Sequence, residues 1–322
     1  MYLVSVLITG ITGFIGSNLA KRLVEDGYDV YGLVRHVSRS DFRSFELVQD
    51  RVRFVEGDLT EYHSVRAAVG SVMPETLVHL GALTPVRYSF DDPFPYMKVN
   101  TQGTVNLVHA VLESSPNIHL IVASTAEVYG WQPKEPTVED VKLTPSSPYG
   151  VSKAAADTYV QMATKVYGLK STLLRCNNTY GRTEEKGFLV EYLVSSMLKN
   201  NPVYIGTPKH VRDYMFVDDH VDAYVRVLKQ KPIGEVFNVS PGNPTTNLEL
   251  AKKIAKITSY KGRIVEGSYP PAYPVRPNQW DTEYIVLNSD RLRTRLGWKP
   301  TLTLDEGLSN VVDAWRSLKP DS

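Results

Sequence analysis

Three glycines near the start of the chain constrain its fold more than any other feature. Gly10, Gly13 and Gly16 stand between an apolar run at 4–9, which predicts a buried strand, and a stretch with helical spacing at 14–26. In a strand–turn–helix unit, such glycines allow a tight turn, a close approach of the backbone to a pyrophosphate, and close packing of the helix on the strand. The spacing is not the usual G-x-G-x-x-G, but its place favours a dinucleotide-binding turn over a plain connection.

Short β-rich runs alternate with longer amphipathic stretches through the first half of the chain. Beyond the first strand, strands are expected at 29–34, 51–55, 76–80, 119–123 and 171–175, and helices at about 95–113 and 149–167. Strands that alternate with helices form βαβ units, because parallel strands need a crossover connection. The sequence therefore predicts an α/β fold with a Rossmann-type, doubly wound parallel sheet.

The pattern changes after about residue 180, where prolines and glycines become denser. We interpret residues 1–180 as a dinucleotide-binding domain and 181–322 as a smaller mixed α/β part that binds the substrate. Within 214–240, a helix at 217–228 and a strand at 236–239 are expected to return to the larger domain. The pattern at 304–318 predicts a closing helix.

Composition excludes several classes of function. With 36 basic and 35 acidic residues, the net charge of +1 gives no general attraction to nucleic acid or membrane surfaces. No apolar run approaches the roughly 18 residues of a membrane span, and no signal-peptide pattern is present, so we expect a cytoplasmic protein. The single Cys176 excludes an internal disulfide framework. The seven histidines lack paired ligand spacing, so no metal site is expected, and His79 is interpreted as a satisfied core residue.

The residues after the second and third strands bear on the choice of dinucleotide. An NAD site usually has an acidic residue after the second strand, whereas an NADP site has an arginine. This chain has Arg35, with Ser38 and Arg39 close behind, and no carboxylate at the strand end. These residues favour NADP, with NAD as the alternative, although a solvated basic loop would look the same. Asp58 follows the third strand and is expected near the adenine amino group.

A tyrosine and a lysine one helical turn apart form the candidate catalytic pair. Tyr149 and Lys153 occupy positions i and i+4 of a predicted helix and therefore share a face. A phenol has a pKa of about 10, and a nearby ammonium lowers it, so Tyr149 is expected to accept the proton of a substrate hydroxyl. Thr125 lies at the end of the fifth strand, where ligands of open α/β sheets bind, and its hydroxyl is expected to share that substrate hydroxyl. A threonine there can also simply bond the local backbone.

Together these residues resemble a known family. The glycine turn, Asp58, the segments 100–104 (NTQGT) and 124–130 (STAEVYG), and the Tyr149/Lys153 pair are similar to extended short-chain dehydrogenases/reductases. The narrower resemblance is to the NAD-dependent epimerase/dehydratase group, and it runs from about residue 4 to about residue 315. It implies an enzyme that transiently oxidises C4 of a nucleotide-diphosphate sugar. A homodimer, formed through the helices before and after the fifth strand, is common in that family and is expected here.

The resemblance also implies three sets of site residues. The catalytic set comprises Thr125, Glu127, Tyr149 and Lys153. The cofactor set comprises Gly10, Thr12, Gly13, Phe14, Ile15, Gly16, Arg35, Ser38, Asp58, Leu59, Leu80, Ala82, Asn100, Tyr149 and Lys153. The substrate set comprises Thr84, Thr125, Ala126, Asn178, Arg212 and Arg276, and its two arginines suit a diphosphate because each offers planar paired donors. Arg182 stands where the family usually has proline, which puts the local turn in doubt.

The product depends on the step that comes after oxidation at C4. Glu127, two residues after Thr125, resembles the glutamate of 4,6-dehydratases and glucuronate decarboxylases. Ala126 replaces the aspartate of many dTDP-glucose dehydratases, whereas GDP-mannose dehydratases also lack that acid and use NADP. The residue pattern therefore favours a 4,6-dehydratase of GDP-mannose type. The alternatives are a UDP-sugar 4-epimerase acting on a hexose or a glucuronate, a UDP-glucuronate decarboxylase, and a non-catalytic NADP-sensing protein, which would usually lack the Tyr149/Lys153 pair.

Overall fold

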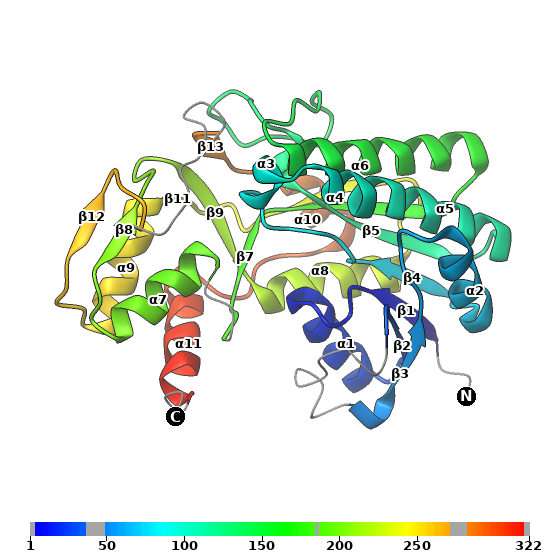
Figure 1. Ribbon diagram of the computed structural model, residues 1–322, viewed down its shortest axis with the longest axis horizontal. Coiled ribbons are helices and arrows are strands. Elements are labelled where there is room, and N and C mark those ends of the chain that lie inside the picture. Colours follow the sequence, from blue (N-terminus) through cyan, green and yellow to red (C-terminus); the bar gives the residue numbers. More distant parts are fainter. Residues whose placement is uncertain (1–3, 37–48, 184–186, 271–281, 319–322) are drawn as a thin grey trace.

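A seven-stranded parallel sheet forms the centre of the molecule (Figure 1). A computed structural model describes residues 4–36, 49–183, 187–270 and 282–318. The strand order is β10-β6-β5-β4-β1-β2-β3, and every neighbouring pair is parallel. The bounds are β1 (Ser5–Thr9), β2 (Asp29–Val34), β3 (Val52–Glu56), β4 (Thr76–His79), β5 (His119–Thr125), β6 (Ser171–Cys176) and β10 (Val236–Val239). The predicted doubly wound sheet is confirmed, including the late return of β10 to its edge beside β6.

Helices cover both faces of this sheet (Figure 1). One face carries α2 (Tyr62–Val72), α5 (Gly103–Ser114) and α6 (Pro148–Tyr167). The other face carries α1 (Phe14–Glu25), α8 (Val217–Gln230) and α10 (Asp290–Leu296). Alternate residues of β1 supply the two cores, since Val6 and Ile8 pack with α1 whereas Leu7 packs with α2 and α5. Burial on both faces explains why the strands read as continuous apolar runs.

A buried polar chain fixes the carboxyl ends of β1 and β4 against each other. Thr9 Oγ1 lies 2.7 Å from His79 Nδ1, and His79 Nε2 lies 3.0 Å from Thr104 Oγ1 on α5. Burial lowers the pKa of His79 to about 3, so the imidazole is neutral. The interpretation of His79 as a satisfied core residue is confirmed. The hydroxyl of Thr9 also accepts from Gly81 N at 3.0 Å and so sets the turn after β4.

The helix expected at 95–113 is interrupted. Short helices α3 (Tyr88–Asp91) and α4 (Phe94–Tyr96) lead into a π-helical segment, η4 (Met97–Gln102), and only then does α5 begin. Asn100 and Thr101 of η4 bond Ser152 of α6, and Asn100 also bonds Leu83 in the segment after β4. These side-chain bonds hold η4 against α6 and the segment after β4, and π-helical segments often occur at functional sites.

A smaller lobe of mixed structure lies to the left in Figure 1. Strand β9 (Val211–Phe216) pairs with β7 (Asn178–Tyr180), β11 (Pro244–Thr246) and β13 (Tyr284–Ile285), while β8 (Val203–Ile205) pairs with β12 (Ile264–Glu266). Helices α7 (Leu189–Leu198), α9 (Asn247–Thr258) and the predicted α11 (Leu304–Ser317) enclose a separate apolar core. Single turns η3 (Gln49–Arg51) and η5 (Ala126–Val128) complete the elements. We propose that the boundary between the dinucleotide-binding domain and the smaller substrate-binding part lies near residue 180.

Within the described ranges, no helix is both long and apolar enough to cross a bilayer. The same residues hold no group of three or more histidine, cysteine, aspartate or glutamate side chains arranged to bind a metal ion.

Candidate active site

The glycine turn between β1 and α1 has no room for side chains. Gly10 has φ +68°, and a Cβ there would lie 2.7 Å from Gly81 N; a Cβ on Gly16 would lie 2.2 Å from Gly10 O. Gly13 caps α1 without a side-chain hydrogen bond. The donors of the first helical turn and the positive end of the helix dipole therefore lie at a bare backbone surface. This arrangement fits the pyrophosphate of a dinucleotide.

The other predicted cofactor residues surround this turn. Leu80 and Ala82 follow β4, whose carboxyl end lies beside that of β1, and the predicted substrate residue Thr84 comes two residues later. Asp58 follows β3, and its Oδ1 accepts from the N–H and the hydroxyl of Thr60, each at 2.9 Å. These bonds hold the carboxylate in its own turn and leave its second oxygen for the predicted adenine contact.

Asn100 is buried and acts on the segment after β4. Its Oδ1 accepts from Leu83 N at 2.8 Å, and its Nδ2 donates to Leu83 O and Ser152 Oγ, each at 3.0 Å. The amide thus ties Leu83 to α6, and both of its donors are already in use. A direct contact between Asn100 and the cofactor stays a prediction.

Tyr149 and Thr125 lie together at the carboxyl end of the sheet. Helix α6 begins at Pro148, because Ser147 Oγ accepts from Gly150 N at 3.0 Å and proline suits the first helical position. The phenol is hydrogen-bonded with Thr125, which ends β5. Tyr96 packs edge-on against the Tyr149 ring, with ring centroids 6.3 Å apart. The predicted neighbourhood of threonine and tyrosine is therefore present.

Lys153 lies on the same helix but its ammonium has a different partner. The side chain is 5 % exposed, and Nζ donates to Ala123 O at 2.7 Å. Burial lowers the pKa of Lys153 to about 8, against an opposing effect of Asp157. Burial also raises the pKa of Tyr149 well above its ordinary value; the Thr125 hydrogen bond opposes this, and Glu127 adds to it. The expectation that Lys153 lowers the pKa of Tyr149 is wrong for this structure, because desolvation dominates and the ammonium bonds Ala123.

Glu127 lies within electrostatic reach of the phenol, in the turn η5 that follows β5. Its N–H donates to Thr125 Oγ1 at 3.3 Å. Gly150 allows the first turn of α6 to approach this segment, because an added Cβ would lie 2.9 Å from Glu127 O. The Ala126 side chain points the other way, into an apolar cluster with Ala154 and Ile285. Because Ala126–Val128 form a single helical turn rather than extended backbone, the alternation of a strand does not continue from Thr125 to Glu127.

The predicted substrate ligands come from the smaller lobe and are only partly described. Asn178 is exposed at the start of β7, opposite Tyr214 of β9. Arg212, on β9, is buried and its Nη1 donates to Val211 O at 2.9 Å. Arg276, like the predicted cofactor residue Ser38 and its neighbour Arg39, lies outside the described residues.

Comparison with known proteins assigns the family. Residues 7–311 match a family model described as GDP-mannose 4,6 dehydratase. The chain is 33 % identical to a UDP-glucose 4-epimerase of Mycolicibacterium smegmatis over 316 residues, which cover 97 % of this chain and 98 % of the relative. It belongs to the NAD-dependent epimerase/dehydratase family of extended short-chain dehydrogenases/reductases. The chain is thus an enzyme of the nucleotide-sugar epimerase/dehydratase class.

Solved structures of this family have the same architecture. A UDP-glucose 4-epimerase of Thermotoga maritima, with UDP-glucose, superposes with a TM-score of 0.87 at 30 % identity, covering 97 % of this chain and 99 % of that one. A dTDP-glucose 4,6-dehydratase of Streptomyces venezuelae, with NAD bound, gives 0.85 at 26 % identity and 97 % coverage of both chains. Epimerases and dehydratases are therefore both close in fold.

The sequence did not predict what holds the turn at Arg182, where other members of this epimerase/dehydratase family usually have proline. Glu191 Oε1 accepts from the N–H groups of Gly181 and Arg182 at 3.0 and 3.1 Å. The guanidinium lies 4.1 Å from the ring centroid of Phe14 and 3.8 Å from that of Phe188. A proline has no N–H to donate, so the arginine fixes this turn in a different way. Arginine in place of proline was the only available signal, and it did not identify Glu191.

The glycine turn yields a direct prediction for this enzyme. In a Gly16→Ala variant the new Cβ must push Gly10 O away, so we expect cofactor affinity to fall by roughly tenfold or more, since such overpacking costs about 1–3 kcal/mol. Fluorescence titration with NAD and NADP measures this affinity. Gly70→Ala on α2, where an added Cβ meets nothing within 4 Å, is the matched control and should bind as wild type does. Equal affinity in the two variants would exclude the turn as the dinucleotide site.

Proposed function

We propose that this enzyme is a UDP-sugar 4-epimerase that oxidises C4 of the sugar and returns the hydride to the opposite face. The observation that carries the proposal is the hydrogen bond between Tyr149 and Thr125 at the carboxyl end of β5, beside the glycine turn. The two UDP-glucose 4-epimerases named above are 33 % and 30 % identical and cover nearly the whole chain. They support the epimerase alternative better than the GDP-mannose dehydratase that the residue pattern favours.

The chain's own residues supply orientation and proton transfer. Thr125 and Tyr149 hold the C4 hydroxyl between them, and Tyr149 accepts its proton as the hydride leaves. A nicotinamide dinucleotide held at the glycine turn would supply the hydride acceptor and, in its oxidised form, a positive charge. A buried phenol needs such a charge close by to ionise, because burial raises the pKa of Tyr149. The ammonium of Lys153, one helical turn after Tyr149 on α6, is held by its hydrogen bond to Ala123 O of β5.

A 4,6-dehydratase is the second candidate, and Glu127 is the reason to keep it. Its carboxylate raises the pKa of the Tyr149 phenol, and a carboxylate that acts on the phenol is a candidate to take the proton from C5. Several dTDP-glucose 4,6-dehydratases are also similar, including one of Mycolicibacterium smegmatis at 29 % identity over 322 residues. The absence of an acid at Ala126 removes the group that many of these enzymes use at C6.

A substrate panel separates these candidates. We expect UDP-glucose or UDP-glucuronate to be converted to its C4 epimer, detected by NMR of the sugar. A 4-keto-6-deoxy product from dTDP-glucose or GDP-mannose would instead establish the dehydratase. In a Glu127→Gln variant, epimerisation should continue, whereas dehydration should stop, because C5 deprotonation needs the carboxylate. No turnover with any member of the panel would contradict the proposal.

Tyr149 provides the second test. A Tyr149→Phe variant should lose about 10²–10⁴-fold in kcat while it still binds cofactor, because only the proton acceptor is removed. Tyr159→Phe on the same helix removes an identical hydroxyl, one that lies 2.6 Å from His109 Nε2, and should keep wild-type turnover. Similar losses in both variants would show that the phenol of Tyr149 has no special role.

We propose NADP as the cofactor. Arg35 follows β2 directly and is exposed, and no carboxylate occurs at positions 34–36. Its guanidinium can pair with a 2′-phosphate through charge-assisted hydrogen bonds. NAD is the alternative cofactor, because similar epimerases and dehydratases have been solved with NAD bound.

An Arg35→Asp variant tests this choice. It should bind NADP roughly 10–100-fold more weakly and NAD no worse, because hydrogen bonds to a charged group contribute about 1.5–3 kcal/mol. Arg66→Asp on α2, where the arginine pairs with Glu113, changes charge equally and serves as control. Wild-type protein that prefers NAD would overturn the NADP proposal.

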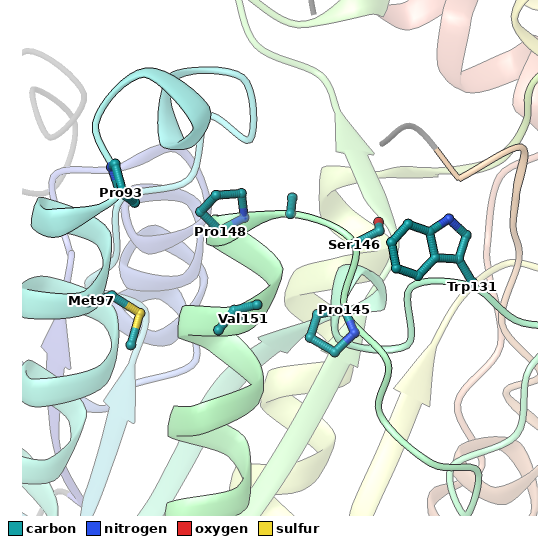
Figure 2. Close-up of a pocket in the computed structure, with 8 residues that line it drawn as sticks. Pro93, Met97, Trp131, Pro145, Ser146, Pro148 and Val151 are labelled. Carbon is teal, nitrogen blue, oxygen red and sulfur yellow. The ribbon is translucent and has the colours of Figure 1, made fainter. Parts of the chain in front are cut away.

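We also propose a homodimer through α5 and α6. Met97 and Val151, 40 % and 44 % exposed, lie on η4 and α6 and line an apolar pocket of about 440 Å³. Figure 2 shows them with Pro148, the first residue of α6, and with Pro93, which precedes α4. Exposed apolar side chains gathered on two packed helices are typical of a protein–protein contact.

A further inference from the structure

One arginine of the smaller lobe reaches the first turn of α1. Arg182 follows β7, and its side chain is 12 % exposed. The guanidinium lies between the ring of Phe14, the first residue of α1, and the ring of Phe188, which precedes α7. A guanidinium this close to an aromatic face is attracted by the ring, and more strongly where water is excluded. A single side chain therefore contacts both the cofactor turn and the smaller lobe.

The smaller lobe holds both the backbone and the side chain of Arg182. The N–H of Arg182 donates to Glu191 of α7 at 3.1 Å, and its carbonyl accepts from Trp315 Nε1 of α11 at 2.8 Å. Its Nη1 donates to Thr179 O of β7, also at 2.8 Å. Because these bonds reach three elements, a movement of Arg182 requires a movement of the lobe around it.

The other contact of Arg182 is the ring beside the glycine turn. Phe14 directly follows Gly13, and its carbonyl accepts from Asn18 Nδ2 at 2.8 Å within α1. The ring also packs on the backbone before Arg182, since a Cβ added to Gly181 would lie 3.6 Å from Phe14 Cζ. The position of this ring is therefore linked to the first turn of α1, whose N–H groups are expected to bind the pyrophosphate.

The Thr179 carbonyl lies beside the predicted substrate ligands. Thr179 follows Asn178 on β7, and β7 pairs in parallel with β9, which carries Arg212. Arg182 thus joins the strand that starts with one predicted diphosphate ligand to the ring next to the predicted dinucleotide turn.

We propose that Arg182 is a positioning residue that couples the two sites, so that a dinucleotide and a nucleoside diphosphate each bind more tightly when the other is present. Each ligand orders the turn that it binds, and Arg182 passes part of that order to the other turn. The second ligand then loses less conformational freedom, and the effect is reciprocal. The inference rests on the proposed function only in taking Asn178 and Arg212 as ligands of the nucleotide.

Calorimetric titration with UDP, in the presence and absence of saturating NADP or NAD, measures the coupling as a ratio of two affinities. We expect wild-type protein to bind UDP about fivefold or more tightly when the dinucleotide is present. In Arg182→Gln, which removes the stacked cation, the two affinities should become nearly equal. A merely structural arginine would change the separate affinities but not their ratio. Equal affinities in the wild type, or an unchanged ratio in Arg182→Gln, would overturn the proposal.

A second variant and a matched control keep the test decisive. Phe188→Leu removes one of the two rings and leaves Arg182 and Phe14 in place, so the ratio should fall in part; this variant decides if Arg182→Gln does not fold. Arg53 of β3 lies 4.4 Å from the ring centroid of Tyr31, away from both turns, so Arg53→Gln should keep the wild-type ratio. The same ratio in Phe188→Leu and Arg53→Gln would contradict the coupling.

This readout needs binding but no turnover, so it is separate from the reaction. If no sugar of the panel is turned over but the ratio changes as stated, the proposed reaction fails while the role of Arg182 stands. If epimerisation is found and the ratio is the same in the wild type and Arg182→Gln, the role of Arg182 fails alone.

Discussion

The parallel register of the central strands is the constraint on which the rest of the site depends. It brings the carboxyl ends of β1, β4, β5 and β6 to one edge of the sheet. The turn at Gly10, the chain Thr9–His79–Thr104 and the hydroxyl of Thr125 meet there because their strands are in register. A slip of one residue in any pair would turn each of these groups to the opposite face.

Burial then sets the charges at this edge. The guanidinium of Arg175 pairs with the carboxylate of Asp157, and the ammonium of Lys153 donates to Ala123 O, while the phenol of Tyr149 and the imidazole of His79 are held neutral. Desolvation is the largest cause of each shift, so a ligand that brings charge and excludes water changes the balance more than a small movement of side chains would.

Local patterns were sufficient to predict the glycine turn, the six leading strands and the place of Thr125 beside Tyr149. They also predicted that the segment 236–239 returns to the larger domain, where it pairs with β6 as β10. What they missed depends on contacts between distant segments. The π-helical η4 is held to Ser152 of α6 by the side chains of Asn100 and Thr101, and the partner of Lys153 is the backbone of β5.

The reaction itself was the hardest feature to predict. Glu127 favoured a dehydratase, and Arg35 favoured the NADP-dependent GDP-mannose branch, whereas the whole-chain relatives include UDP-glucose 4-epimerases and dTDP-glucose dehydratases. A change of single residues near C5 of the sugar or near the 2′-phosphate can alter the product or the cofactor without altering the fold. A pattern of family motifs therefore predicts oxidation at C4 but does not predict the step that follows it.

The central claim is that hydrogen leaves C4 of the sugar as hydride and stays with the cofactor until it is returned. Turnover of UDP-glucose that carries deuterium at C4 tests it most directly, with the product analysed by NMR and mass spectrometry. The account predicts slower turnover and deuterium retained at C4 of the epimer. Transfer of the label to C6 would show the dehydratase instead. Loss of deuterium to the solvent would contradict the account, because it would mean that C4 loses a proton rather than a hydride.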